Sequence, residues 1–290
     1  MYYYIINPAA GGGKINKVQE NLKERLKVLG IAGEFAKSTG PGDVAKLTNL
    51  AINKGFKTIV AVGGDGTINE AINAISKKNV VLGIVPMGNT NELAKLLGID
   101  GWQNACNILA ARKVEEIDLG KINDQYFITS ASIGFDNVIF GLEKYAKSSF
   151  PANTLYNFKI ANAARTFKPM DLNIEFAENF KVSTTCCNFS IANCTFTDYL
   201  PQKSRPQDDL FDAIILNNLS FRDLVSYGKG KLDIRKRPGS FSVFHTKKVT
   251  ITSKESLPVS ADGQIVAQTP VTIEISDRKL KVIVSRRRHF

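Results

Sequence analysis

The sequence predicts a two-part chain: an N-terminal α/β domain with a parallel sheet, followed by a β-rich, sandwich-like domain. Residues 1–117 alternate short apolar runs with helix-period segments, which is the pattern of βαβ units. From residue 118 most segments are short, β-rich and bounded by Gly, Pro, Asn or Asp. With 290 residues, of which 43% are hydrophobic, the chain can bury a substantial core and is expected to form two domains. We therefore place the first domain at 1–117 and the second at 118–278.

The first element is an apolar strand that runs into a glycine-rich turn. Tyr2 to Ile6 has the composition of a buried strand, and the chain then turns at Asn7 and Pro8. Glycines let a backbone turn tightly and approach an anion closely. Three glycines precede an amphipathic helix that begins near Lys14, namely Gly11, Gly12 and Gly13.

The second glycine-rich turn carries a carboxylate and is the most informative segment of the chain. An apolar strand ends at Gly63, and Gly64, Asp65, Gly66 and Thr67 lead into a helix that includes Asn69. The helix N-terminus and the Thr67 hydroxyl offer hydrogen-bond donors to phosphate. Asp65 would repel a bare triphosphate, so its presence favours contact with Mg²⁺ or uptake of a proton during phosphoryl transfer. The alternative is a simple tight turn after a strand.

A third apolar strand, Val80 to Val85, ends in a turn that contains Gly88, Thr90 and Asn91. Ligands of open parallel sheets bind beyond the carboxyl ends of the strands, so we expect the three turns to meet at one edge. The turns match neither the Walker A pattern nor the Rossmann fingerprint. Asn91 and Glu92 also suit helix capping and first-turn charge, and both roles can coexist.

The second half is predicted to be mostly strands with two helical insertions. Helices are expected within Leu142 to Phe167 and within Asp223 to Lys231. The expected strands are Gln125 to Ser130, Asp171 to Phe176, Val182 to Asn193, Ala213 to Leu216, Ser242 to Phe244, Lys248 to Thr252, Val271 to Ile275 and Lys279 to Ser285.

The three motifs in this order resemble the diacylglycerol kinase catalytic family, which includes sphingosine and ceramide kinases and is distantly similar to NAD kinases. The resemblance implies that residues 279–290 return to the first domain and that the active site lies in the cleft between the domains. It also implies that ATP is the nucleotide, with Mg²⁺. The implied nucleotide-binding residues are Asn7, Pro8, Gly11, Gly12, Gly13, Thr39, Gly63, Gly64, Asp65, Gly66, Thr67, Asn69, Gly88, Thr90 and Asn91. For Thr39 the alternative is a loop residue that leads into the next helix.

Two later segments also match family motifs, each with a departure. Asp208 and Asp212, with main-chain oxygens near Arg205 and Leu210, resemble the ligands of a structural Mg²⁺, and hard oxygen ligands suit that ion. The family has glycine where this chain has Asp209, and a solvated acidic turn is the alternative. The family usually has Asp-Gly-Glu where this chain has Asp262, Gly263 and Gln264.

The implied catalytic residues are Asp65, Asp262 and Gln264. A carboxamide accepts no proton near neutral pH, so Gln264 can orient a hydroxyl but cannot act as the general base. We therefore predict a slow or unconventional lipid kinase that transfers the γ-phosphate of ATP to a hydroxyl of a lipid such as diacylglycerol. Two alternatives stay open: a catalytically impaired nucleotide- or lipid-binding regulatory protein, and a kinase of a soluble acceptor similar to NAD kinase.

Charge and composition bear on partners and location. The 38 Lys and Arg residues exceed the 27 Asp and Glu residues, which leaves a net charge of +11. No nucleic-acid-binding signature accompanies this charge, and an anionic membrane surface that carries the lipid acceptor fits it better. No run approaches the roughly 20 apolar residues of a membrane span. The four cysteines form no disulfide or zinc pattern. We expect a cytoplasmic protein, peripheral to the inner face of the membrane. A homodimer is compatible with the chain but is not specified by it.

Overall fold

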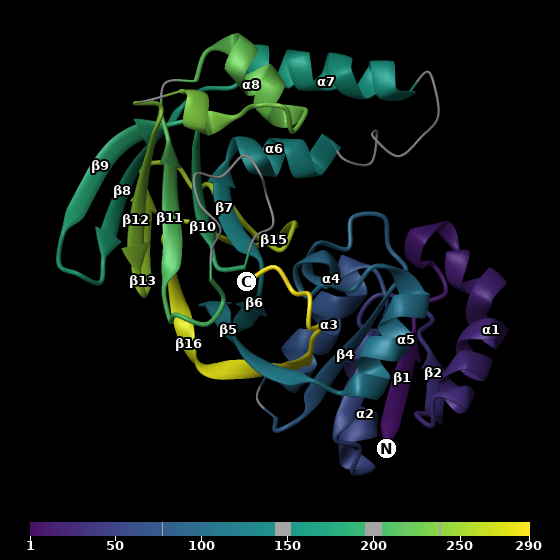
Figure 1. Ribbon diagram of the computed structural model, residues 1–290. Helices are drawn as coiled ribbons and strands as arrows, with labels where there is room; N and C mark the ends of the chain where they lie inside the picture. The colour runs from purple at the N-terminus through teal and green to yellow at the C-terminus, as the bar shows by residue number, and fades with distance from the viewer. Residues whose placement is uncertain (77, 143–151, 195–204, 218, 238) are drawn as a thin grey trace.

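The computed structural model describes residues 1–290 except 77, 143–151, 195–204, 218 and 238 (Figure 1). Strands and helices alternate in its first part. Their bounds are β1 Tyr2–Ile6, α1 Lys14–Val28, β2 Gly33–Lys37, α2 Asp43–Asn53, β3 Thr58–Gly63, α3 Asp65–Ile75, β4 Val81–Pro86, α4 Glu92–Leu96 and α5 Gly101–Ala111.

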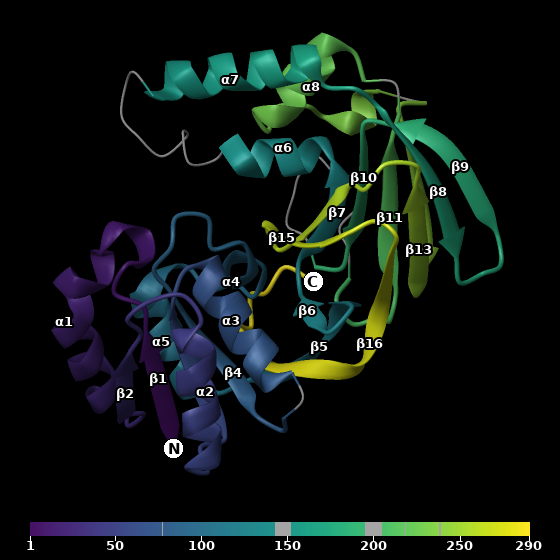
Figure 2. The same ribbon diagram turned by 180° about the vertical axis from the view of Figure 1, so that it is seen from behind.

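The first four strands form a parallel sheet in the order β2-β1-β3-β4. Every residue of β1 and β3 is buried, because helices cover both faces of the sheet. Figures 1 and 2 show α2 and α3 on one face and α5 on the other. The helices expected after the first and second glycine-rich turns are present as α1 and α3, and α3 begins at Asp65.

The described residues of the second part contain the remaining strands, three α-helices and a short 3-10 helix, Ile234–Lys236. Their bounds are β5 Val114–Ile122, β6 Gln125–Phe127, β7 Ser130–Gly134, α6 Phe135–Leu142, α7 Ala152–Thr166, β8 Met170–Phe176, β9 Lys181–Cys186, β10 Asn188–Ala192, β11 Phe211–Leu216, α8 Phe221–Gly228, β12 Phe241–Thr246, β13 Lys248–Ser253, β14 Pro258–Ala261, β15 Gln264–Gln268 and β16 Val271–Ile283.

Two sheets pack face to face in this part. Strands β12-β11-β10-β7-β14-β15 form an antiparallel six-stranded sheet, whereas β8, β9 and β13 extend the large sheet that also contains the parallel strands. Their facing sides share one apolar core, to which Ile251 and Ile273 contribute from the large sheet and Ile133 and Phe189 from the small one. Helices α6 and α8 pack on the outer face of the small sheet. The predicted fold class, α/β followed by a β sandwich, is confirmed.

Several predicted segments have different bounds in the structure. Gln125 to Ser130 divides between β6 and β7, and the first helical insertion already begins at Phe135. Val182 to Asn193, expected as one strand, is divided between β9 and β10, which belong to different sheets. The chain crosses between the sheets at Cys187, whose amide donates to the Leu216 carbonyl (2.8 Å). A continuous β-rich run cannot reveal such a crossing because both strands have the same composition.

Strand β16 connects the two parts of the molecule. Its first residues pair antiparallel with β13, as Ile273 does with Val249. Its last residues pair parallel with β4, as Lys281 does with Val81. Along its length β16 pairs with β5, with a register shift between Ile275 and Lys279. The sequence suggested two strands here, and the structure has one of 13 residues. Figure 1 shows β5 and β16 crossing together from one part to the other.

Candidate active site

The three glycine-rich turns follow β1, β3 and β4 and contact one another. The Asn7 Nδ2 donates to Thr67 Oγ1 (2.9 Å), which joins the first turn to the second. A Cβ added at Gly88 would lie 2.7 Å from the Gly64 Cα, so the second and third turns pack backbone against backbone. Gly11 has a φ of +59°, and a Cβ there would lie 2.0 Å from the Met87 carbonyl oxygen. Glycine is therefore required where these turns meet.

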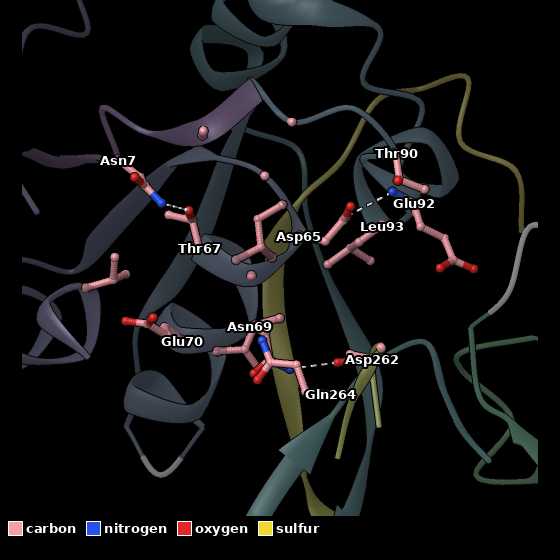
Figure 3. A pocket seen from close by; sticks show the side chains of 18 of the residues that line it. Asn7, Asp65, Thr67, Asn69, Glu70, Thr90, Glu92, Leu93, Asp262 and Gln264 are labelled. Carbon is pink, nitrogen blue, oxygen red and sulfur yellow. Dashed lines mark hydrogen bonds between the residues drawn. The ribbon is translucent and has the colours of Figure 1, made fainter. Parts of the chain in front are cut away.

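The turns line a cavity of about 760 Å³ that the second part of the chain closes from the other side. Residues Thr129 and Ser130, Phe140 and the turn between β14 and β15 complete the wall. The predicted residues that line the cavity are Asn7, Pro8, Gly11, Thr39, Gly64, Asp65, Gly66, Thr67, Asn69, Gly88, Thr90, Asp262 and Gln264. Figure 3 shows several of these side chains converging on the N-terminus of α3.

Four predicted nucleotide-binding residues do not line the cavity, for identifiable reasons. Gly12 and Gly13 lie behind Gly11, where Gly13 starts α1. Gly63 lies beneath the turn, and a Cβ there would collide with the Thr67 side chain. The Asn91 side chain is turned onto the Gly88 backbone, where Oδ1 accepts from the amide and Nδ2 donates to the carbonyl, each at 2.9 Å. These residues shape the turns.

The Asp65 carboxylate joins the second turn to the third. One oxygen accepts from the Asn91 amide and the other from the Glu92 amide, both at 2.9 Å, so Asp65 caps α4 from a neighbouring helix (Figure 3). Burial raises the pKa of this carboxyl, the two amides oppose that effect, and the Asp262 carboxylate adds to it. A carboxylate with a raised pKa inside a cleft is a candidate for proton transfer.

The Asp262 carboxylate is fixed by donors from both parts of the chain. It accepts from Asn69 Nδ2 (2.9 Å), from the Ile128 amide (3.1 Å), and from the Thr129 amide and hydroxyl (2.8 and 2.6 Å). These donors use most of the lone pairs of the carboxylate. Asp262 therefore anchors the turn that carries Gln264.

Gln264 lies over the start of α3. Its Nε2 is 3.9 Å from the position that a Cβ would take at Gly66, and the residue is exposed. Its carboxamide therefore lies at the N-terminal end of α3, where it can donate to or accept from a hydroxyl but cannot remove its proton.

Thr39 lies on the cavity wall and also stabilises the start of α2. Its amide donates to Asp43 Oδ2 (3.0 Å), and its hydroxyl donates to the same oxygen. The structure thus shows the loop role that was the alternative for this residue, at a position that a nucleotide could still reach.

The two carboxylates expected to bind a structural metal are already engaged by protein groups. Asp208 Oδ1 accepts from the Leu210 amide (3.1 Å), and Asp212 Oδ1 pairs with His245 Nδ1 (2.8 Å). Within the described ranges, no group of three or more His, Cys, Asp or Glu side chains is placed to bind a metal ion. Arg205 is exposed. This donor set does not fit the expected metal.

Sequence reasoning missed two residues on α3. Asn73 pairs with the Tyr126 backbone, donating to its carbonyl (3.0 Å) and accepting from its amide (2.8 Å). The four-residue spacing of Asn69 and Asn73, which places both on one helix face, was the available signal. Glu70 lines the cavity, and its Oε2 is buried without a hydrogen-bond partner among the described residues.

Comparisons with known proteins find similar sequences. Residues 1–122 match the model of the diacylglycerol kinase catalytic domain. A diacylglycerol kinase of Bacillus subtilis (strain 168) is 24% identical over 276 residues, which cover 92% of this chain and 90% of that protein. A diacylglycerol kinase of Staphylococcus aureus (strain bovine RF122 / ET3-1) is 23% identical over 286 residues, with 96% and 90% covered.

A solved structure shows the same fold. The crystal structure of a diacylglycerol kinase from Bacillus anthracis str. Sterne superposes with a TM-score of 0.77 at 19% identity, covering 99% of this chain and 98% of that one. No helix in the described part of the chain is long and apolar enough to cross a membrane. Residues 1–122 are therefore similar to diacylglycerol kinase catalytic domains, and nearly the whole chain is similar to proteins named diacylglycerol kinases, the family that its glycine-rich motifs resemble.

Proposed function

We propose that this protein is an ATP-dependent lipid kinase that transfers the γ-phosphate of ATP to a hydroxyl of a membrane lipid such as diacylglycerol. The observation that carries the proposal is the single cavity that is lined by all three glycine-rich turns and also by Asp262 and Gln264 of the β-rich part. Phosphate donor and acceptor can meet there. ATP enters this cavity as MgATP, so this Mg²⁺ arrives as part of the substrate.

The first part of the chain binds the nucleotide in this proposal. The N-terminus of α3 has no side-chain cap and lines the cavity, and the amides of a helix N-terminus favour phosphate. The Thr67 hydroxyl, oriented by Asn7, adds a donor. Phosphoryl transfer depends mostly on positioning and charge stabilisation, which this arrangement supplies. We assign the nucleotide to residues 1–117 with 279–290, and the acceptor to residues 118–278.

Gln264 and Asp65 both act on the hydroxyl of the acceptor. Gln264 orients the lipid hydroxyl over the start of α3, and Asp65 takes its proton as the new oxygen–phosphorus bond forms. The bond between the γ-phosphorus and the bridging oxygen breaks, and ADP leaves with the electron pair of that bond. Asp65 suits this role better than Asp262, because Asp262 already accepts hydrogen bonds from Asn69, Ile128 and Thr129.

The acceptor would reach the site from a membrane. The net charge of +11 favours an anionic surface, where each Lys or Arg near the headgroups contributes about 1 kcal/mol. We accordingly propose a cytoplasmic enzyme that is peripheral to the inner face of the membrane.

A panel of acceptors tests the proposal. Transfer of labelled γ-phosphate from MgATP is measured with diacylglycerol, a sphingoid base and phosphatidylglycerol in anionic mixed micelles, and with NAD as a soluble acceptor. Label in one lipid supports the lipid kinase. Label only in NAD would favour the soluble-acceptor kinase. ATP binding without transfer would favour a binding protein, the alternative that Gln264 in place of glutamate suggests.

A further inference from the structure

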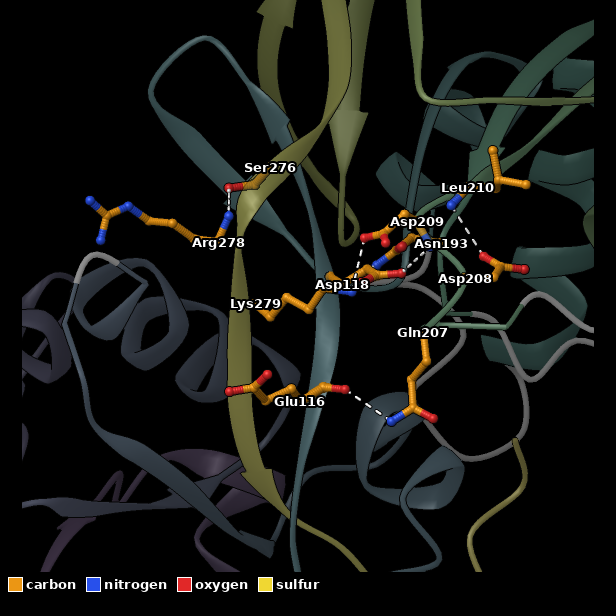
Figure 4. Close-up of polar contacts among 10 residues, drawn as sticks. All are labelled: Glu116, Asp118, Asn193, Gln207, Asp208, Asp209, Leu210, Ser276, Arg278 and Lys279. Atoms are coloured by element: carbon orange, nitrogen blue, oxygen red, sulfur yellow. Dashed lines mark hydrogen bonds and ion pairs between the residues drawn. The ribbon is translucent and has the colours of Figure 1, made fainter.

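Lys279 forms two ion pairs where β5 and β16 cross between the two parts of the molecule. Its Nζ lies 2.8 Å from Asp118 Oδ1 on β5 and 2.9 Å from Asp209 Oδ1 in the segment that precedes β11. Asp118 is fully buried, whereas Lys279 is about one-third exposed. Figure 4 shows the lysine between the two carboxylates.

The same segment is joined to β5 by three hydrogen bonds. The Asp118 amide donates to the Pro206 carbonyl (2.7 Å), and the Asp209 amide donates to Asp118 Oδ2 (2.9 Å). The Gln207 side chain donates to the Glu116 carbonyl (2.9 Å). One oxygen of Asp118 thus binds the segment and the other binds Lys279. A fully buried carboxylate requires a counter-charge, and Lys279 supplies it.

Asp209 stands where the related motif has glycine. Its φ is +57°, a left-handed conformation that Asp tolerates better than most side chains. Asp209 keeps the backbone conformation that suits glycine, and its carboxylate gives Lys279 a second partner.

We propose that Lys279 is a built-in counter-ion that fixes segment 206–209 on β5, in place of a bound divalent cation. The chain then needs no metal at this position, in agreement with the engaged state of Asp208 and Asp212. The cation comes from β16, the strand that both parts of the molecule share.

The fixed segment connects to the active site through buried groups. Asn193, which is fully buried, donates from Nδ2 to the Asp118 carbonyl (2.9 Å) and to the Ile128 carbonyl (2.8 Å). The amides of Ile128 and Thr129 in turn donate to Asp262. Lys279 is therefore a positioning residue for the turn that carries Gln264.

Thermal unfolding without nucleotide tests the proposal independently of any activity. The wild-type melting temperature is expected to be the same in EDTA and in millimolar MgCl₂. In EDTA, Lys279→Met should lower it by about 5–10 °C, because Asp118 is left without a counter-charge. Mg²⁺ should restore a substantial part of this loss by binding the freed carboxylates. Lys281→Met is the matched control on the same strand, where the exposed contacts to Asn79 and Glu116 predict a much smaller loss.

Three outcomes would overturn the proposal: a wild-type protein stabilised by Mg²⁺, a Lys279→Met protein of unchanged stability, or a loss that no divalent cation recovers. Should Lys279→Met fail to fold, Lys279→Gln is the milder uncharged variant, with the same expectations. Asp209→Asn keeps Lys279 on Asp118 and should remain insensitive to EDTA and Mg²⁺; a gain of metal dependence there would also count against the proposal.

The positioning role rests on the proposed kinase function and has its own readout. Lys279→Met should lower kcat about tenfold or more with little change in the KM for ATP, and Lys279→Arg, which keeps the cation, should recover most of kcat. Equal kcat values in Lys279→Met and wild type would contradict positioning. An inactive wild-type protein would refute the kinase proposal and leave the stability result intact.

Discussion

The Asn69 side chain donates a hydrogen bond to the Asp262 carboxylate (2.9 Å) and joins residues that are 193 positions apart. Asn69 lies on α3, one helical turn after Asp65, and Asp262 lies two residues before Gln264. The contact therefore sets the distance between the two sides of the cavity. Asn73 strengthens the same connection through Tyr126.

Removing this contact should impair chemistry more than nucleotide binding. Asn69→Ala is expected to lower kcat by about 10- to 100-fold, because small misplacements of reacting groups have effects of that size. The KM for ATP should change little. Steady-state kinetics check this, with Asn49→Ala on the exposed face of α2 as the control. Equal kcat values for Asn69→Ala and wild type would mean that the two sides are positioned by other contacts.

Asp65 is expected to control the acid side of the pH profile. Burial raises its pKa, and a base must be deprotonated to act, so activity should rise with pH through a pKa above the usual range of an aspartic acid. Asp65→Asn should lower kcat by about 10²- to 10⁴-fold and remove this limb from any residual activity. The control is circular dichroism and ATP affinity, because Asp65 also caps α4. If activity still rises with pH in this range in Asp65→Asn, the titrating residue is not Asp65.

Replacing Gln264 by glutamate tests whether a missing base limits the rate. The new carboxylate would lie over Gly66 at the N-terminus of α3. We expect kcat to rise about tenfold or more, since general-base assistance typically contributes about 10²- to 10⁴-fold and Asp65 already supplies part of it. Gln264→Ala is the companion variant and should lose activity through lost orientation. Turnover that does not improve in Gln264→Glu would show that another step limits the rate.

The contact between Gly64 and Gly88 should be intolerant of side chains. A Cβ at Gly88 would lie 2.7 Å both from the Gly64 Cα and from Asn91 Oδ1, so Gly88→Ala must push the second and third turns apart. ATP affinity is expected to fall at least about tenfold, measured by calorimetry. Gly141→Ala on α6, where no atom lies within 4 Å of the added Cβ, is the control and should bind ATP normally. Normal ATP binding by Gly88→Ala would place the nucleotide elsewhere.

The sequence predicted the fold class and the convergence of the three turns because both follow from local patterns. Strand and helix periods identify βαβ units, and parallel strands bring their carboxyl ends to one edge. Contacts between distant segments left no such pattern. The capping of α4 by Asp65 and the crossing at Cys187 depend on tertiary packing. The same holds for the ion pair of Lys279. Nothing in the sequence around Lys279 indicates that it neutralises the buried Asp118.

The most direct test of the account is transfer of labelled γ-phosphate from MgATP to diacylglycerol in anionic mixed micelles by wild-type protein and by Asp65→Asn. The account predicts labelled lipid with the wild type. With the variant, the signal should fall by at least about 10²-fold, although both proteins bind ATP. Equal transfer by the two proteins would remove Asp65 from the chemistry. ATP binding with no transfer to any acceptor would contradict the kinase itself.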